Sequence, residues 1–406
     1  MTAYMRPIRE TIALEDARAT VLRAAAPIER TERAALADAR DRVAAAPVIS
    51  ALDVPPFDRA AMDGYAVRAE DTFGAGRHEP RRLRVVGTIH SGDVPRASVG
   101  PGETMQIATG APVPDGADAV VMVEETERAG ADDVRVFTPV YPRQNVGRRA
   151  SDIGAGAIVV QSGELLMPSR IGALAAAGTV DVEVYAKPRI ALIVTGNEVV
   201  EPGRPLAPGQ IYDVNRFTLG ALVSRHGGVP VPVPTAVDTL DALSMALHAA
   251  IGEDVIVFSG GSSVGERDLM IDLLSAHGEI LFHGVAVKPG KPTVFGRVNG
   301  KPVFGMPGNP TSCLSNGYML LVPMIRKMAR LPEYRPHVVR VPLARRIIST
   351  TGRHQFYTVR LADGAAVPAF KGSGDITSMA HADGYLEIPA QTDIVEAGEL
   401  VDVKLF

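Results

Sequence analysis

The chain carries its most reactive side chains in four short loops, and each loop follows an apolar run of strand length. Glu198 follows RIALIVTG, Asp268 ends SGGSSVGERD, Lys288 and Lys291 lie in KPGKP, and the turn PGNP follows KPVFGM. Ligands of parallel α/β sheets bind beyond the carboxyl ends of the strands, which share one edge. We therefore predict that these loops form one site.

Two of the loops are suited to bind an anion, because a predicted helix follows each of them. Backbone N–H groups at a helix N-terminus attract negative charge, and the helix dipole adds to this effect. Thr311 or Ser312 could cap the second helix. The loop residues are Ser259, Gly260, Gly261 and Ser262 in the first loop and Pro307, Gly308, Asn309 and Pro310 in the second. Either motif alone could be an ordinary tight turn, but both beside two lysines predict a substrate with phosphate and oxyanion groups.

Three carboxylates, Glu198, Asp238 and Asp268, stand at or near the ends of predicted strands. Their oxygens could join a divalent cation to a substrate phosphate, and Mg²⁺ suits such ligands best. Two of them also have a simpler interpretation, because Asp268 could cap a helix and Asp238 could be a solvated surface residue. We assign a Mg²⁺ site to Glu198 and Asp268.

The elements that must hold these loops follow from hydrophobic spacing. Residues 188–330 alternate between strand-like and helix-like patterns, which is typical of a mostly parallel sheet covered by helices on both faces. Near the N-terminus, apolar residues at helical spacing predict a helical hairpin. These residues are Leu14, Ala17 and Val21 in one helix and Leu36, Ala39 and Val43 in the other.

The segments before and after the central α/β region contain short apolar runs broken by turn residues, a pattern typical of β structure. The runs LRVVGTIH, ETMQIATG and AVVMVEET predict a small β domain, and residues 150–187 show two strand-like pieces around a small-residue helix. After Pro332 the pattern predicts a compact barrel or small sandwich. We expect a multidomain α/β plus β protein with these domains: 1–53 plus 150–187, helical; 54–149, inserted β; 188–330, central parallel-sheet α/β; 331–406, C-terminal β-barrel.

Composition excludes several classes of protein. The net charge of −4 and the absence of a Lys/Arg run argue against nucleic acid as a partner. Cys313 is the only cysteine, so a reducing, cytoplasmic setting fits, and no apolar run is long enough to span a membrane. The motifs of P-loop nucleotidases, Rossmann dehydrogenases and α/β-hydrolases do not occur.

Eight segments, in this order along nearly the whole chain, resemble the molybdopterin molybdenumtransferase family, which includes bacterial MoeA proteins and the E domain of gephyrin. They are DVPPFDRAAMDGYAV (53–67), IATGAPVPDGADAVVMVEE (107–125), NVGRRASDIGAG (145–156), TGNEV (195–199), GQIYDVN (209–215), SGGSSVGERD (259–268), KPGKP (288–292) and MPGNPTS (306–312). The resemblance implies an elongated four-domain subunit, a homodimer, and an active site that residues of the inserted domain of the partner subunit complete.

The resemblance also implies roles for individual residues. Catalytic positions of the family match Asp63, Glu198, Asp268, Lys288 and Lys291. Positions that contact substrate match Thr109, Asp152, Asp238, Ser259, Gly260, Gly261, Ser262, Pro307, Gly308, Asn309, Pro310, Ser312, Arg353 and Ser373. Within this set, Ser312, Arg353 and Ser373 match a molybdate-binding region. One departure concerns charge: many bacterial members have a lysine where this chain has Gly284, after His283.

The activity implied by the resemblance is insertion of molybdate into adenylylated molybdopterin, with Mg²⁺ as cofactor and release of AMP. A molybdopterin adenylyltransferase would supply the substrate. Three alternatives stay open: a tungstate-inserting paralogue, a molybdopterin adenylyltransferase, and a non-catalytic scaffold. The retained Asp63, Glu198, Asp268 and both lysines argue against the scaffold.

Overall fold

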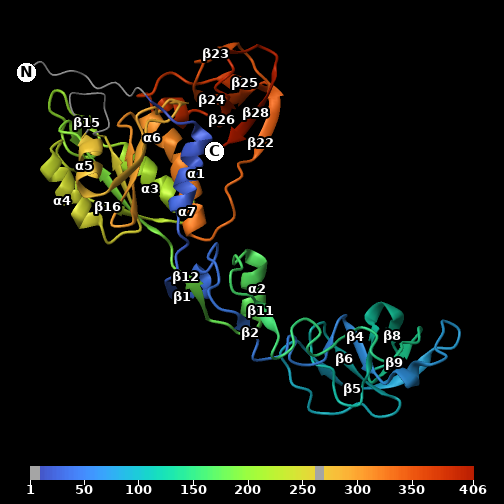
Figure 1. Cartoon of the computed structure of the whole chain (residues 1–406). Coiled ribbons are helices and arrows are strands. Elements are labelled where there is room, and N and C mark those ends of the chain that lie inside the picture. The colour runs from blue at the N-terminus through green and yellow to red at the C-terminus, as the bar shows by residue number, and fades with distance from the viewer. Residues whose placement is uncertain (1–9, 261–268) are drawn as a thin grey trace, which may run out of the picture. The chain divides into compact units, whose positions relative to one another are not determined.

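The computed structural model describes residues 10–260 and 269–406, which divide into two compact units (Figure 1). One unit consists of the described parts of Met1–Thr31 and Tyr185–Phe406, and the other is Glu32–Val184. No helix in the described part of the chain is long and apolar enough to cross a membrane.

A six-stranded sheet forms the centre of the first unit, with strand order β16-β13-β17-β21-β20-β18. The first four strands are parallel, whereas β20 and β18 run antiparallel to their neighbours. The strands are β13 (Arg189–Val194), β16 (Val229–Pro232), β17 (Val255–Ser259), β18 (Glu279–His283), β20 (Val294–Val298) and β21 (Lys301–Met306). The sheet is therefore mixed, since β20 alone runs against the other five strands. The prediction of a mostly parallel sheet is confirmed, and the narrower description as a parallel sheet was wrong at β20.

The physical reason lies in the turn between β20 and β21. Asn299 and Gly300 both have positive φ, 50° and 76°. Two consecutive residues of this kind, in particular Asn-Gly, form the tight turn whose twist suits an antiparallel hairpin. A connection this short cannot join parallel strands, which need a crossover of a dozen residues or more.

Helices cover both faces of this sheet, because neighbouring strand residues point to opposite sides. Ile190 and Leu192 pack with one group of helices, and Ala191 and Ile193 pack with the other. The first group contains α1 (Leu14–Ala24), α3 (Asn215–Arg225), α6 (Pro310–Asn316), a π-helical turn (Gly317–Leu321) and α7 (Val322–Met328), and the second contains α4 (Leu240–Ala250) and α5 (Leu269–His277). The blue α1 lies beside the orange α7 in Figure 1, and its predicted apolar stripe is buried.

The second helix of the predicted hairpin is not formed. Residues Thr31–Ala35 are strand β1, which pairs with β12 (Asp181–Tyr185), and Leu36–Asp38 form one 3₁₀ turn. The backbone N–H of Leu36 donates to Val180 O at 2.9 Å, and Ala44 bridges to Val184. Pairing with a distant segment thus replaces the hydrogen bonds of a local helix, while still burying Ala39 and Val43.

The segment that provides this pairing has the predicted order of strand, helix and strand. It consists of β11 (Ile158–Val160), α2 (Pro168–Ala176) and β12. Strand β11 pairs with β2 (Val48–Ile49), so the segment returns to the N-terminal part of the chain.

A second six-stranded sheet lies in the other unit, with order β7-β4-β6-β5-β9-β8. Its strands are β4 (Gly64–Val67), β5 (Arg81–Ile89), β6 (Glu103–Ile107), β7 (Ala119–Met122), β8 (Thr126–Arg128) and β9 (Asp133–Val136), and a separate pair joins β3 (Arg59–Ala60) to β10 (Val146–Gly147). The three strands predicted from sequence are confirmed here. Since Gly64 pairs with Ile107, the residues flanking these two strands, Asp63 and Thr109, become neighbours.

The C-terminal residues form a third sheet, and its two ends approach each other. Its order is β19-β24-β26-β28-β22, with β25 on β24, and a bridge from Leu343 to Ala366 joins the end of β22 to β25. The strands are β22 (Val338–Pro342), β24 (His354–Ala362), β25 (Ala365–Pro368), β26 (Gly384–Ile388) and β28 (Leu400–Leu405), with a ribbon of β23 (Ile347–Ile348) and β27 (Ile394–Val395) and a short α8 (Thr377–Ala380). Strand β19 (Val287–Lys288) comes from the KPGKP segment and joins this sheet.

His226 follows α3 and is a buried histidine without hydrogen-bond partners. Its side chain is 2% exposed, and neither ring nitrogen has a partner in the described part of the chain. Its ring meets Tyr334 edge-on, with centroids 4.7 Å apart. Burial, aided by the positive charges of Arg326 and Arg225, lowers the pKa of His226 to about 4.

Stability should therefore fall in mild acid because of this residue. An unfolded histidine has a pKa near 6.5, so between about pH 6.5 and 4 the unfolded chain binds a proton that the folded chain does not. By linkage, the free energy of unfolding is lost as the pH falls through this window, by at most about 3 kcal/mol. His226→Phe should lose less stability over this range than the wild type in urea denaturation. His381→Phe, at an exposed position, should behave like the wild type, and equal pH dependence in all three proteins would contradict the assignment.

Candidate active site

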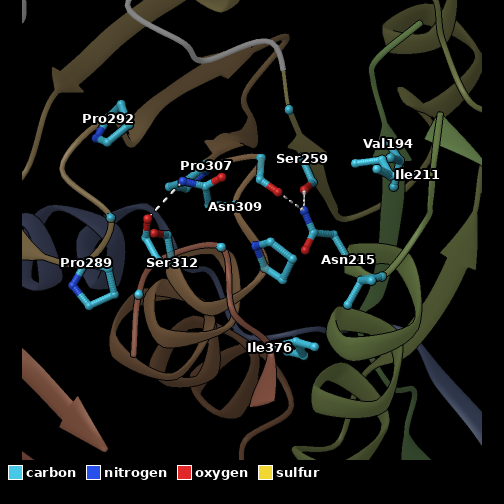
Figure 2. A pocket seen from close by; sticks show the side chains of 18 of the residues that line it. Val194, Ile211, Asn215, Ser259, Pro289, Pro292, Pro307, Asn309, Ser312 and Ile376 are labelled. Carbon is cyan, nitrogen blue, oxygen red and sulfur yellow. Dashed lines mark hydrogen bonds between the residues drawn. The ribbon is translucent and has the colours of Figure 1, made fainter. Parts of the chain in front are cut away.

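A cavity of about 1300 Å³ lies where the carboxyl ends of β13, β17 and β21 approach the C-terminal sheet. Thirteen of the residues predicted to form the site line it: Glu198, Asp238, Ser259, Gly260, Lys288, Lys291, Pro307, Gly308, Asn309, Pro310, Ser312, Arg353 and Ser373. We call the KPGKP segment, residues 288–292, the lysine loop. Figure 2 shows its Pro289 and Pro292 on one side and Val194 and Ile211 on the other. The predicted convergence of the loops is thus present in the structure.

Six predicted site residues are not among the described residues that line the cavity. Gly261, Ser262 and Asp268 fall outside the described residues. Asp63, Thr109 and Asp152 belong to the unit Glu32–Val184 and are exposed there.

Asn215 connects two of the loops that line the cavity. Its side-chain nitrogen donates to Ser259 Oγ and to the backbone oxygen of Gly308, both at 2.7 Å (Figure 2). Asn215 is 6% exposed and begins α3. A buried hydrogen bond of this kind is costly to break, because each lost partner leaves an unsatisfied polar group. The residue therefore fixes the end of β17 against the turn after β21.

A second buried asparagine holds the lysine loop. Asn316 is fully buried, and its side-chain nitrogen donates to Gly290 O at 2.8 Å and to Thr293 Oγ1. Gly290 has φ of 107°, and a Cβ there would lie 2.4 Å from Asn316 Oδ1. At the start of the loop, Lys288 Nζ donates to Thr350 Oγ1 at 2.6 Å. The loop is thus positioned by α6 on one side and by the C-terminal residues on the other.

A helix begins at the turn after β21, as the sequence suggested, but its first two residues offer no free N–H group to an anion. Asn309 occupies the N-cap, without a side-chain cap, and Pro310 has no N–H. The N–H of Thr311 donates to Ser373 O at 3.1 Å and its hydroxyl to Asp375 O. The predicted caps Thr311 and Ser312 are therefore wrong. Asn309 Nδ2 also donates to Ser373 Oγ at 3.0 Å, so this turn is tied to the C-terminal residues.

Two carboxylates approach each other beyond β13 and β16. Burial raises the pKa of Asp238, the Thr195 hydroxyl opposes this shift, and the negative charge of Glu198 raises the pKa further. Asp238 Oδ1 is buried without a well-formed hydrogen bond to any described residue. The interpretation of Asp238 as a solvated surface residue therefore does not fit. A cation between the two carboxylates would favour the ionised form of Asp238.

Charges of opposite sign enter the cavity from different elements. Glu198 and Asp238 come from the loops after β13 and β16, and a third lining carboxylate, Asp213, is already paired with Arg216 at 3.0 Å. The cations come from the lysine loop and the C-terminal residues, namely Lys288, Lys291, Arg353 and Lys371. The cationic part suits oxyanions, and the acidic part suits a divalent cation.

Asp63 and Thr109 form a small polar site in the other unit. The N–H of Thr109 donates to Asp63 Oδ1 at 2.7 Å. Hydrogen bonds from the backbone and side chain of Thr109 hold the pKa of Asp63 below its usual value, so this carboxylate is ionised at neutral pH. Asp152 does not share these bonds, and its N–H donates to Val54 O.

Sequence reasoning missed several residues of the cavity. Asn215 and Asn316 hold its loops, and Tyr212, Phe370 and Lys371 line it. The only signal for Asn316 was a polar residue within the apolar run SCLSNGYMLL. Phe370 and Lys371 stand in a segment without periodicity, so only the folded chain reveals them.

Comparison with known proteins gives three matches that together span most of the chain. Residues 12–178 match the MoeA N-terminal region (domain I and II), residues 191–327 a probable molybdopterin binding domain, and residues 340–406 the MoeA C-terminal region (domain IV).

Whole-length relatives agree with these matches. The chain is 36% identical to molybdopterin molybdenumtransferase 2 of Mycobacterium tuberculosis, over 95% of this chain and 96% of that protein. It is 31% identical to molybdopterin molybdenumtransferase of Haemophilus influenzae, over 97% and 98%. The crystal structure of a molybdopterin biosynthesis MoeA protein from Pyrococcus horikoshii superposes with a TM-score of 0.82 at 40% identity, over 98% of this chain and 99% of that one.

The close contact at Gly290 can be tested with a matched pair of substitutions. Gly290→Ala and Gly300→Ala both place a side chain at positive φ, which costs about 1 kcal/mol or more. Only at Gly290 does the new Cβ meet another group, since none lies within 4 Å at Gly300. Gly290→Ala should therefore lower the free energy of unfolding by more than Gly300→Ala in urea denaturation. Equal losses would argue against a tightly held lysine loop.

Proposed function

Because the chain belongs to the molybdopterin molybdenumtransferase (MoeA) family, and so is an enzyme of molybdenum cofactor biosynthesis, we propose that its cavity binds adenylylated molybdopterin and inserts molybdate, with release of AMP. Its multidomain α/β fold is that of MoeA crystal structures. The observation that carries the proposal is the separation of charge in one cavity of about 1300 Å³. Adenylylated molybdopterin contains a phosphoanhydride and molybdate is a separate oxyanion, so this pair of substrates suits a cavity with both cationic side chains and carboxylates that could hold a divalent cation.

In this proposal the cationic residues bind the oxyanions. Lys288, Lys291 and Arg353, with the hydroxyls of Ser312 and Ser373, would hold molybdate and offset its charge. The bond from Lys288 to Thr350 already orients that ammonium group before substrate arrives. Such preorganised charge stabilises a transition state without reorganisation during the reaction. The two thiols of the substrate then form two Mo–S bonds, and their two protons leave with one oxo group of molybdate as water. A second water adds to the phosphoanhydride, and the P–O bond to AMP breaks so that AMP leaves.

The acidic residues fit a magnesium ion. Asp238 has a buried oxygen without a hydrogen-bond partner among the described residues and lies near the Glu198 carboxylate. No group of three His, Cys, Asp or Glu residues gathers in the described part of the chain. Mg²⁺ needs only one or two carboxylates, because water and substrate phosphates complete its octahedral coordination. Glu198 and Asp238 would therefore suffice. Asp268 would add a third carboxylate from residues outside the described range. When bound, the ion would neutralise charge on the phosphoanhydride as it is cleaved.

We also propose that the chain works as a homodimer. The family resemblance assigns function to Asp63, Thr109 and Asp152, which belong to the other compact unit. Asp63 is exposed and ionised, so it could act as a base or orient water at the site of a partner subunit. Its hydrogen bond from Thr109 would fix its direction.

The reaction is tested by incubating the purified protein anaerobically with adenylylated molybdopterin, Mg²⁺ and either molybdate or tungstate. AMP should appear only with an oxyanion, and the product should activate a cofactor-free molybdoenzyme. Asp63→Ala should lose at least tenfold in rate. Tight substrate binding without AMP release under either oxyanion would sink the proposal, and faster turnover with tungstate would identify a tungstate-inserting enzyme.

The Mg²⁺ site makes a separate prediction about Asp238. Asp238→Asn removes a charge that faces the proposed ion, so the Mg²⁺ concentration for half-maximal rate should rise by about tenfold. Asp241→Asn removes the same charge from an exposed position at the start of α4 that does not line the cavity. It should leave the Mg²⁺ dependence unchanged. A Mg²⁺ titration of AMP release measures both, and identical curves for the two variants would exclude Asp238 from the site.

A further inference from the structure

The cavity has two aromatic side chains among its described lining residues, Tyr212 and Phe370. Residues 261–268 contain no aromatic residue. The two rings come from different elements. Tyr212 lies in β15 (Ile211–Tyr212), which pairs with β14 (Val199–Val200), and Phe370 follows β25 in the C-terminal residues.

The Phe370 ring packs against the ring of Tyr357. Its centroid lies 5.5 Å from that of Tyr357, with 43° between the ring planes, and Phe370 itself is half-buried. The backbone on both sides is fixed, because Ala369 N–H donates to Thr358 O and Lys371 N–H donates to Ser378 Oγ, both at 2.9 Å. Phe370 thus packs its ring against Tyr357 and is also one of the residues that line the cavity.

Tyr212 is fixed in a comparable way on the acidic side. Its hydroxyl donates to Arg204 O at 2.9 Å, and its backbone pairs with Val200. The preceding residue, Ile211, donates its N–H to Glu198 O. Tyr212 as a whole residue is 42% exposed, which leaves area for a ligand.

Two fixed rings suit a ligand with two planar heterocycles. Adenylylated molybdopterin has a pterin at one end and an adenine at the other, with the phosphates between them. The dithiolene next to the pterin must reach the oxyanion, and the proposed oxyanion contacts Arg353 and Ser373 belong to the same C-terminal part as Phe370. The phosphates lead from there toward the carboxylates beside Tyr212.

We propose that Phe370 stacks on the pterin and Tyr212 on the adenine, so that the two rings set the direction in which the substrate lies. This inference rests on the proposed function, since it assumes that substrate. Stacking on aromatic side chains tolerates different heterocycles, so the order of the rings depends on the charges around each aromatic residue.

The experiment compares variants that remove a ring with variants that keep it. In the full-length protein, dissociation constants for molybdopterin and for AMP are measured by anaerobic equilibrium dialysis. Phe370→Leu should weaken molybdopterin binding about tenfold and leave AMP binding unchanged, and Tyr212→Leu should do the reverse. Phe370→Tyr and Tyr212→Phe keep the rings and should bind like the wild type. Thermal unfolding checks that each variant is folded.

The outcomes separate this inference from the function on which it rests. If the wild type binds both ligands and neither Leu variant weakens binding, the stacking proposal is overturned while the proposed function survives. If Phe370→Leu weakens AMP binding instead, the assigned direction is overturned. If the wild type binds neither ligand, the proposed function fails and this inference fails with it. Loss of binding in Phe370→Tyr as well would indicate a packing effect and would also contradict stacking.

Discussion

The Asn215 amide holds together two loops that are more than forty residues apart in the chain. Its two hydrogen bonds join the end of β17 to the turn after β21 at the base of α3. The parallel strands β13, β17 and β21 bring their carboxyl ends to one edge, but strand pairing alone does not fix the loops beyond it. Asn316 does the same for the lysine loop. Each amide is buried, and the cavity keeps its shape because breaking either contact would leave polar groups unsatisfied.

Charge imposes the second constraint. The proposed substrates, an oxyanion and a phosphoanhydride, would require cations in the cavity, yet a cavity lined only by cations would repel the proposed divalent metal. The chain meets both needs with different elements. The loops after β13 and β16 supply carboxylates, and the lysine loop and the C-terminal residues supply the positive groups. The raised pKa of Asp238 reflects the cost of keeping an anionic cluster half-buried.

Much of this arrangement could be predicted from sequence because it depends on local rules. Strand-length apolar runs and the loops after them, together with the family resemblance for Arg353 and Ser373, predicted thirteen residues that line the cavity, while their roles stay predictions. The second N-terminal helix was wrong, because residues 31–44 pair with residues 165–166 and 180–185, and no local pattern reveals partners so distant in the chain. The antiparallel hairpin of β20 and β21 also follows a local rule, because Asn299-Gly300 is a tight-turn signal in the sequence. Asn215 and Phe370 could not be assigned, since their roles depend on neighbours from other elements. The four domain boundaries and the roles of individual residues stay predictions.

Strand β19 has a consequence for the modularity of the molecule. Its residues lie in the chain between two strands of the mixed sheet, yet they pair with β24 of the C-terminal sheet, and His354 N–H donates to Ala286 O next to them. Ala286 also donates to Ile12 O near the N-terminus. The start of the lysine loop is thus held by backbone hydrogen bonds within a layer that includes the N-terminal segment, the central domain and the C-terminal sheet. If residues 188–330 were transferred alone to another protein, β19 would lose its pairing partner β24. A chimaera of two relatives should therefore fold only when the N-terminal segment, the lysine loop and the C-terminal sheet come from the same parent.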